Sequence, residues 1–110
     1  MLTIVLNSHP AGEMFDYGLS LALAASDGEE PVQVLIHGVL LLELSRGRRT
    51  EEASFAAKRL CQLELFEIPT FAVKYPNRSR GIGKPLEFIR RVDPGQYRHL
   101  LKTSDRVLYF

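Results

Sequence analysis

Two short apolar segments near the N-terminus constrain the fold more than any other feature of the sequence. Leu2 to Leu6 and Val32 to Ile36 are nearly continuous runs of Val, Ile and Leu, without the polar alternation of a half-exposed strand. The run from Leu2 to Leu6 has the composition of a strand buried on both faces, which occurs mainly in parallel sheets that helices cover. Val32 to Ile36, which follows Pro31, is predicted as the second strand. An Ala- and Leu-rich segment, about Glu13 to Ser26, lies between the two runs and predicts the connecting helix.

Helical patterns and turn residues continue this alternation along the chain. Small and apolar residues recur at helical spacing from Ala53 to Cys61, with Thr50 as the expected N-cap. Asp93 followed by Pro94 is typical of a helix start. Val39 to Leu44 is short and apolar, which favours a single helical turn packed on the sheet. Further strands are predicted at Thr70 to Val73, Leu86 to Ile89 and Arg106 to Phe110.

These elements predict one α/β domain over residues 1–110, with a mostly parallel five-stranded sheet in a three-layer α/β/α arrangement. A chain of 110 residues is long enough for one hydrophobic core and too short for two. In parallel sheets, binding sites form where loops leave the carboxyl ends of the strands. The loops expected there are residues 7–12, 37–49 and 74–85.

Composition and cysteine content exclude several classes of protein. Cys61 is the only cysteine, so an internal disulfide and a Cys-rich metal site are both excluded. Apolar runs such as Val39 to Leu42 are far shorter than the roughly 20 residues that cross a bilayer. The N-terminus also lacks the basic segment of a secretory signal. We therefore expect a cytoplasmic protein that holds no metal or cofactor and does not contact a membrane.

The formal net charge of +1 is an average over two oppositely charged parts of the chain. Residues 1–45 contain six acidic residues and no Lys or Arg, which gives −6. Residues 46–110 contain all fourteen basic residues and the other seven acidic ones, which gives +7. Because one small domain holds both parts, we expect acidic and basic regions on one surface, which suit directional association with partners.

The turn from Asn7 to Gly12 is the first candidate site, because it leads into a helix N-terminus whose free N–H groups can hold an anion. It matches neither a dinucleotide fingerprint nor a P-loop, and a plain strand-to-helix turn with local hydrogen bonds from Asn7 or Ser8 is the simpler interpretation. His9 and His37 each follow a strand and could face one crevice. A shared metal would lack a third ligand, so histidines that cap strand ends are favoured.

Two basic clusters form the second group of candidates. The segment from Lys74 to Lys84 contains no acidic residue and suits phosphate or an acidic protein surface. Its aromatic residues are too sparse for a base-stacking platform, so we expect no direct contact with nucleic acid. A solvated basic surface is the alternative interpretation. The candidates for anion or partner binding in this segment are Lys74, Arg78 and Arg80, and those for a partner interface in the other cluster are Arg46, Arg48 and Arg49.

Cys61 is a candidate for thiol chemistry, since a thiolate could carry sulfur. A reactive thiol needs exposure and a nearby positive charge that lowers its pKa. Cys61 lies on the same predicted helix face as Ala57 and Leu60, while Lys58 and Arg59 point elsewhere. A buried structural cysteine is therefore the favoured interpretation.

Six segments, taken in order, resemble the DsrE/DsrF/DsrH sulfur-relay superfamily, and within it the TusC (DsrF) subunits most. They are TIVLNSHPAG, LALAAS, VQVLIHGVLLL, LFEIPTFAV, SRGI and SDRVLYF, and they span nearly the whole chain. The resemblance implies a small α/β domain with a parallel sheet. It also implies assembly with TusB-like and TusD-like subunits into a dimer of heterotrimers.

In that family the complex passes persulfide sulfur toward 2-thiouridine synthesis in tRNA, and the reactive cysteine belongs to the TusD-like subunit. The resemblance aligns Arg80-Gly81 with the turn that follows this cysteine, which places Val73 at the cysteine's position. A non-catalytic subunit is therefore implied, and self-association is expected when the chain is alone. Two alternatives remain open, a stand-alone thiol carrier that uses Cys61 and a module that binds a small anion or nucleotide.

Overall fold

The computed structural model describes residues 1–45, 51–74 and 86–110, which form one sheet with helices on both faces. The strands are β1 (Leu2–Leu6), β2 (Val32–Ile36), β3 (Thr70–Val73), β4 (Arg90–Val92) and β5 (Arg106–Tyr109). The helices are α1 (Glu13–Asp27), α2 (Gly38–Ser45), α3 (Glu51–Leu65) and α4 (Pro94–Lys102). None of the helices in these described ranges is long and apolar enough to cross a membrane.

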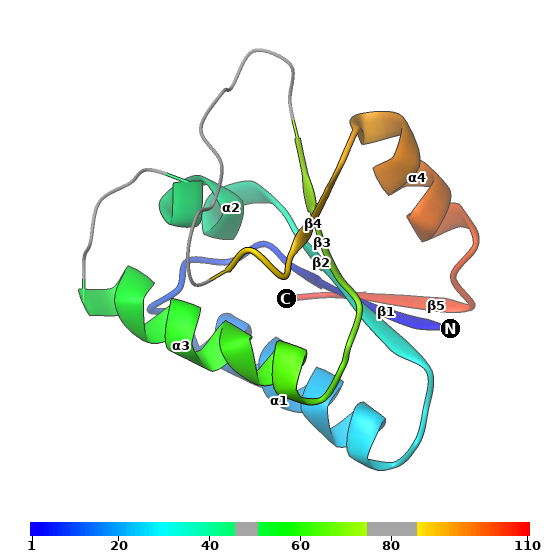
Figure 1. The fold of residues 1–110 in the computed structure, drawn as a ribbon, viewed down its shortest axis with the longest axis horizontal. Coiled ribbons are helices and arrows are strands. Elements are labelled where there is room, and N and C mark those ends of the chain that lie inside the picture. Colours follow the sequence, from blue (N-terminus) through cyan, green and yellow to red (C-terminus); the bar gives the residue numbers. More distant parts are fainter. Residues whose placement is uncertain (46–50, 75–85) are drawn as a thin grey trace.

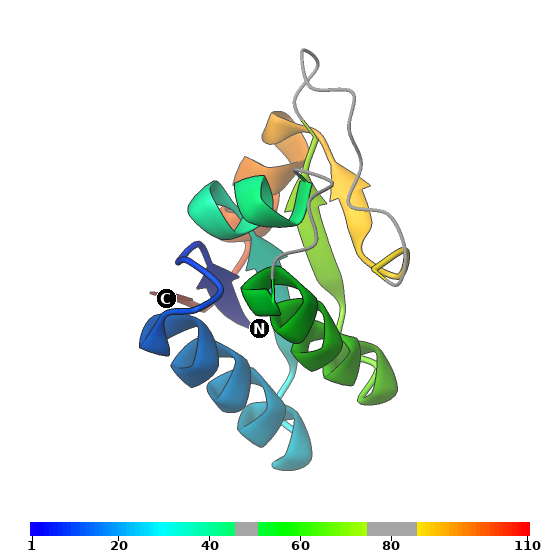
Figure 2. The same cartoon turned by 90° about the vertical axis from the view of Figure 1, so that its left-hand side faces the viewer.

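The strands lie in the order β4-β3-β2-β1-β5, and every neighbouring pair is parallel. Helices α1 and α3 lie side by side on one face, whereas α4 lies on the opposite face (Figures 1 and 2). Helix α2 follows β2 directly and lies near the carboxyl ends of the strands (Figure 1). This confirms the predicted α/β/α arrangement, with a sheet that is entirely parallel over the described strands.

The sheet core is apolar because β1 and β2 occupy its centre, where helices cover both faces. All five residues of each strand are buried, which confirms the prediction made for β1. Helix α1 approaches the sheet closely at Gly18. A Cβ atom at this position would lie 2.5 Å from Leu6 Cδ2 and 2.8 Å from Phe110 Cβ, so the glycine permits this contact.

One polar network lies within the core, on the α4 face of the sheet. Gln33 Nε2 donates a hydrogen bond to Thr3 Oγ1 at 2.9 Å, and the Thr3 hydroxyl also bonds the Ser104 hydroxyl. Ser104 in turn donates to the Leu100 carbonyl at 2.7 Å. The network therefore satisfies the buried Thr3 and Gln33 side chains and ties the end of α4 to the two central strands.

Local signals place α4 as predicted. Asp93 accepts a hydrogen bond from Gln96 N, and the Gln96 side chain accepts one from Asp93 N, so the two residues form a capping box. Pro94 occupies the first turn, where its missing N–H has no intrahelical partner to lose. The expected single helical turn after β2 is longer and forms the helix Gly38–Ser45. Thr50, the expected N-cap of α3, lies outside the described residues.

The predicted strand at Leu86–Ile89 is wrong. These residues form a turn in which Ile89 N donates to the Leu86 carbonyl at 3.1 Å, and the strand follows at Arg90–Val92. The apolar side chains of Leu86 and Ile89 are buried through this turn, so they do not need a pleated strand. Arg90 and Arg91 are compatible with β4 because this strand forms an edge of the sheet.

Candidate functional site

The loops after β1 and β2 lie side by side at the carboxyl end of the sheet. His37 N donates to the Leu6 carbonyl at 3.0 Å, and Asn7 N donates to the Phe110 carbonyl at 2.8 Å. Gly38 has φ of 59°, and a Cβ atom there would lie 3.2 Å from Asn7 Cβ. The structure therefore brings Asn7 and His37 together, as expected for residues that follow adjacent parallel strands.

The turn after Asn7 is held by local hydrogen bonds. Ala11 N donates to His9 Nδ1 at 3.1 Å, and Gly12 N donates to the His9 carbonyl at 2.9 Å. Asn7 and Ser8 are half-buried, whereas His9 is exposed. The favoured interpretation of a plain strand-to-helix turn accounts for these contacts, although His9 supplies the acceptors that were expected from Asn7 or Ser8. The α1 N-cap, Gly12, provides no side-chain hydrogen bond.

The His37 ring makes an aromatic contact with α4, the helix on the face of the sheet opposite α1 and α3. The His37 ring stacks on Tyr97 of α4, with 5.1 Å between the centroids and 29° between the planes. Because α4 is distant in the sequence, this partner could not be predicted locally. Over the described parts of the chain, no three His, Cys, Asp or Glu side chains form a group able to hold a metal ion.

The last residue of β3 is Val73, the position at which the resemblance places a sulfur-carrying cysteine, and its side chain is aliphatic. Val73 is only 1% exposed, and its neighbour Lys74 is exposed, with its backbone N donating to the Val92 carbonyl at 2.6 Å. The other basic candidates, Arg46, Arg48, Arg49, Arg78 and Arg80, lie outside the described residues. Their expected binding roles therefore stay predictions.

Cys61 lies on α3, half-buried and packed against the hydrophobic core. Burial raises the pKa of its thiol, and the nearby Glu64 carboxylate raises it further. A raised pKa lowers the thiolate fraction at neutral pH, and the thiolate is the nucleophilic form. The environment of Cys61 is therefore opposite to that of a reactive thiol.

Alkylation of Cys61 should accordingly be slow. We expect iodoacetamide at pH 7.5 to modify the native protein at least about 10-fold more slowly than the protein in guanidinium chloride, because only unfolding removes burial and Glu64 together. The native rate should rise with pH, since a raised pKa means that thiolate forms at higher pH. Mass spectrometry follows the reaction, and equal rates in the two states would contradict the assignment of Cys61 as structural.

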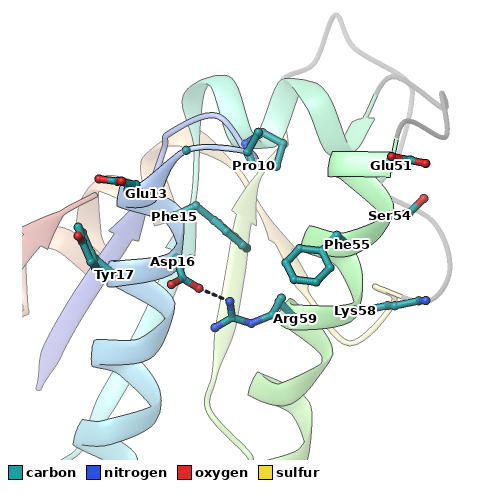
Figure 3. A pocket seen from close by; sticks show the side chains of 12 residues that line it. Pro10, Glu13, Phe15, Asp16, Tyr17, Glu51, Ser54, Phe55, Lys58 and Arg59 are labelled. Carbon is teal, nitrogen blue, oxygen red and sulfur yellow. Dashed lines mark hydrogen bonds and ion pairs between the residues drawn. The ribbon is translucent and has the colours of Figure 1, made fainter.

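A groove with a volume of about 1040 Å³ lies between the N-terminal halves of α1 and α3. Phe15 and Phe55 face each other across it, and an ion pair between Arg59 and Asp16 connects the two helices (Figure 3). Phe55 is 61% exposed. Carboxylates and basic groups both line the groove, so it suits side chains of another protein better than a phosphate group. The charged lining residues are Glu13, Asp16, Glu51, Lys58 and Arg59.

Sequence reasoning missed this groove. Its existence depends on how α1 and α3 cross, and no local pattern encodes that contact. The available signal was Phe55, an aromatic residue on a helix that is otherwise rich in charged and small residues, together with the acidic first turn of α1. These features give no hint of their proximity until the fold is known.

Comparisons with known proteins identify the fold. No family model and no curated protein sequence matches the chain. Among solved structures, the ychN protein from E. coli matches with a TM-score of 0.74 and 21% sequence identity, over 99% of this chain and 97% of that one. The chain thus shares the fold of the ychN protein over almost its full length, in agreement with the parallel α/β domain expected from its sequence.

Proposed function

We propose that this chain is a non-catalytic subunit of a cytoplasmic sulfur-relay complex of the TusBCD/DsrEFH type. The observation that carries the proposal is Val73, which stands at the end of β3 where the resemblance places the sulfur-carrying cysteine of a TusD-like subunit. Its side chain is aliphatic and 1% exposed. The fold shared with the ychN protein supports membership of this structural class.

The chemistry of sulfur relay requires a thiol at the transfer site. An acceptor thiolate attacks the outer sulfur of a donor persulfide, a new S–S bond forms, and the donor leaves as a thiolate. Valine cannot take part in either role, and Cys61 is half-buried on α3 with a raised pKa. In the proposed complex the transfer therefore takes place on a TusD-like partner, and the sulfur continues toward 2-thiouridine in tRNA.

The role left to this chain is to bind and shape its partners. Protein interfaces concentrate binding energy in aromatic side chains at the centre of well-packed pockets. The α1–α3 groove offers such a surface, because Phe55 is exposed inside a concavity bordered by both charge signs (Figure 3). We therefore propose the α1–α3 groove as the contact for a TusB-like or TusD-like subunit.

The structure bears differently on the two alternative functions, the thiol carrier and the anion-binding module. The thiol-carrier hypothesis loses support, since the pKa of Cys61 is raised rather than lowered. The anion-binding hypothesis combines the turn from Asn7 to Gly12 with Lys74 and Arg80, and of these Arg80 lies outside the described residues. The α1–α3 groove itself does not favour an anion, because Glu13, Asp16 and Glu51 line it.

Co-expression with TusB-like and TusD-like proteins tests the proposal. We expect the three chains to elute as one species in size-exclusion chromatography, and Phe55→Ser to weaken that species at least about 10-fold, as loss of a buried aromatic contact does. Leu65→Ser is the matched control, because Leu65 lies on the same helix, is 79% exposed and does not line the α1–α3 groove. Three separate peaks at micromolar concentration would overturn the proposed complex, and equal effects of the two variants would overturn the role of the groove.

A further inference from the structure

The outer edge of β5 has unpaired backbone groups at two positions. Phe110 N donates to the Val5 carbonyl, and the Phe110 carbonyl accepts from Asn7 N, both at 2.8 Å. Backbone groups alternate in direction along a strand, so Leu108 also faces β1 whereas Val107 and Tyr109 direct their N–H and C=O groups away from it. Among the described strands none pairs with this side of β5.

We propose that this edge pairs with the same edge of a second copy of the chain, as two antiparallel β5 strands around a twofold axis at Leu108. The proposal goes beyond the sulfur-relay function and does not depend on it. In this register Val107 lies opposite Tyr109 of the other copy, and both residues carry outward-facing groups. Each such pair exchanges two hydrogen bonds, so the two symmetric pairs satisfy all four outward N–H groups.

With the twofold axis at Leu108, each outward-facing residue lies opposite another outward-facing residue. Moving the axis by one residue reduces the number of such pairs. A twofold axis at Val107 would align only one pair of outward-facing residues, because Tyr109 would lie opposite Asp105, whose N donates to the Met1 carbonyl. With the axis at Leu108, side chains on the α4 face form two Tyr–Val pairs, a combination that stabilises antiparallel strands. On the α1 face, Leu108 meets its copy and Arg106 lies opposite Phe110, so no like charges face each other.

Exposed apolar side chains beside the edge indicate that a protein covers it. Tyr109 is 58% exposed, and β5 contains no proline, while its one charged residue, Arg106, lies at its start. Helix α1 borders the same edge, since Phe110 packs at Gly18. Its surface also carries a stripe of exposed apolar residues at helical spacing. Figure 3 shows the Tyr17 side chain of this stripe pointing away from Phe55, although Tyr17 also lines the α1–α3 groove. The stripe consists of Met14, Tyr17 and Leu21, which are 45%, 58% and 37% exposed.

The stripe of Met14, Tyr17 and Leu21 adds buried surface area to the small area that pairing of the two β5 strands buries. A specific interface buries about 1,200–2,000 Å² in total, and the side chains of one short strand provide only part of it. In the dimer, Leu108 and Phe110 of each copy lie on the α1 face next to the stripe of the other copy. A second copy of this chain therefore covers both the open backbone edge and the neighbouring apolar stripe.

Paired charges at the two outward positions test the register. Val107→Lys with Tyr109→Lys places lysine opposite lysine twice, and we expect the dimer dissociation constant to rise about 100-fold. Val107→Lys with Tyr109→Glu changes the same positions but places lysine opposite glutamate, so we expect it to remain dimeric. Sedimentation velocity from 1 to 100 µM measures the association, and circular dichroism confirms that each variant is folded.

A disulfide at the twofold axis provides a second measurement. Cα atoms of the Leu108 pair would lie about 4.5 Å apart, within the range that a disulfide can bridge. In a Cys61→Ala background, we expect Leu108→Cys to form a covalent dimer under mild oxidation and Val107→Cys not to do so. A wild-type monomer at 100 µM, or dimers that respond equally to the lysine–lysine and lysine–glutamate variants, would overturn the proposal.

Discussion

Replacing Gly18 with alanine should destabilise the protein by about 1–3 kcal/mol, even though alanine is the better helix former. The added Cβ would lie 2.5 Å from Leu6 Cδ2, 2.8 Å from Phe110 Cβ and 2.9 Å from Phe110 Cγ. All three distances are shorter than real Cβ contacts allow, so α1 or the side chains beneath it must shift. The gain in helix propensity, about 1 kcal/mol, opposes this strain and is smaller.

Gly28→Ala is the control for the Gly18 substitution. Gly28 ends the same helix, and its nearest contacts for an added Cβ are at 3.6 Å, which is ordinary van der Waals distance. We expect this variant to be unchanged or stabilised by up to about 1 kcal/mol. Urea unfolding followed by circular dichroism measures both variants, and a Gly18→Ala protein as stable as wild type would contradict the close approach of α1 to the sheet.

Thr3→Val should also destabilise the protein, by about 1–3 kcal/mol, although it barely changes the shape of the side chain. Thr3 is fully buried, and its hydroxyl accepts a hydrogen bond from Gln33 Nε2 and bonds the Ser104 hydroxyl. Valine removes both interactions and leaves the Gln33 amide buried without this acceptor. The loss comes mainly from the unsatisfied donor, not from packing.

A double-mutant cycle separates these causes. Thr3→Val with Gln33→Leu removes both the donor and the acceptor, so the double variant should recover much of the stability lost in the single one. The free energies of unfolding of the four proteins give the coupling between the two side chains. Additive losses would mean that Thr3 and Gln33 act independently, against the network seen in the structure.

The sequence predicts those parts of the fold whose signals are local. The apolar composition of β1 predicts burial on both faces, and the Asp93-Pro94 pair predicts the start of α4. Leu86–Ile89 was predicted as a strand because a buried turn and a short buried strand have the same apolar composition. Distinguishing them requires knowledge of which segment pairs with β3, and that information is not local.

In the candidate site, too, some features have local sequence signals and others depend on contacts between distant segments. Asn7 and His37 could be assigned to loops at one edge of the sheet because each follows a predicted parallel strand. Their proximity depends on the strand order, which no local pattern encodes. The stacking of His37 on Tyr97 depends on how α4 packs on the sheet, and the ion pair between Asp16 and Arg59 depends on how α1 crosses α3. Such contacts join segments far apart in the sequence, so no window of residues predicts them.

The position of β1 between β2 and β5 has a consequence for how the chain folds during synthesis. Leu2 pairs with Arg106, so almost the whole chain must leave the ribosome before the sheet can close on that side. At typical translation rates this delay is on the order of 10 s. Throughout it one edge of β1 is open, and a nascent chain with such an edge is exposed to pairing with the wrong strand until β5 arrives.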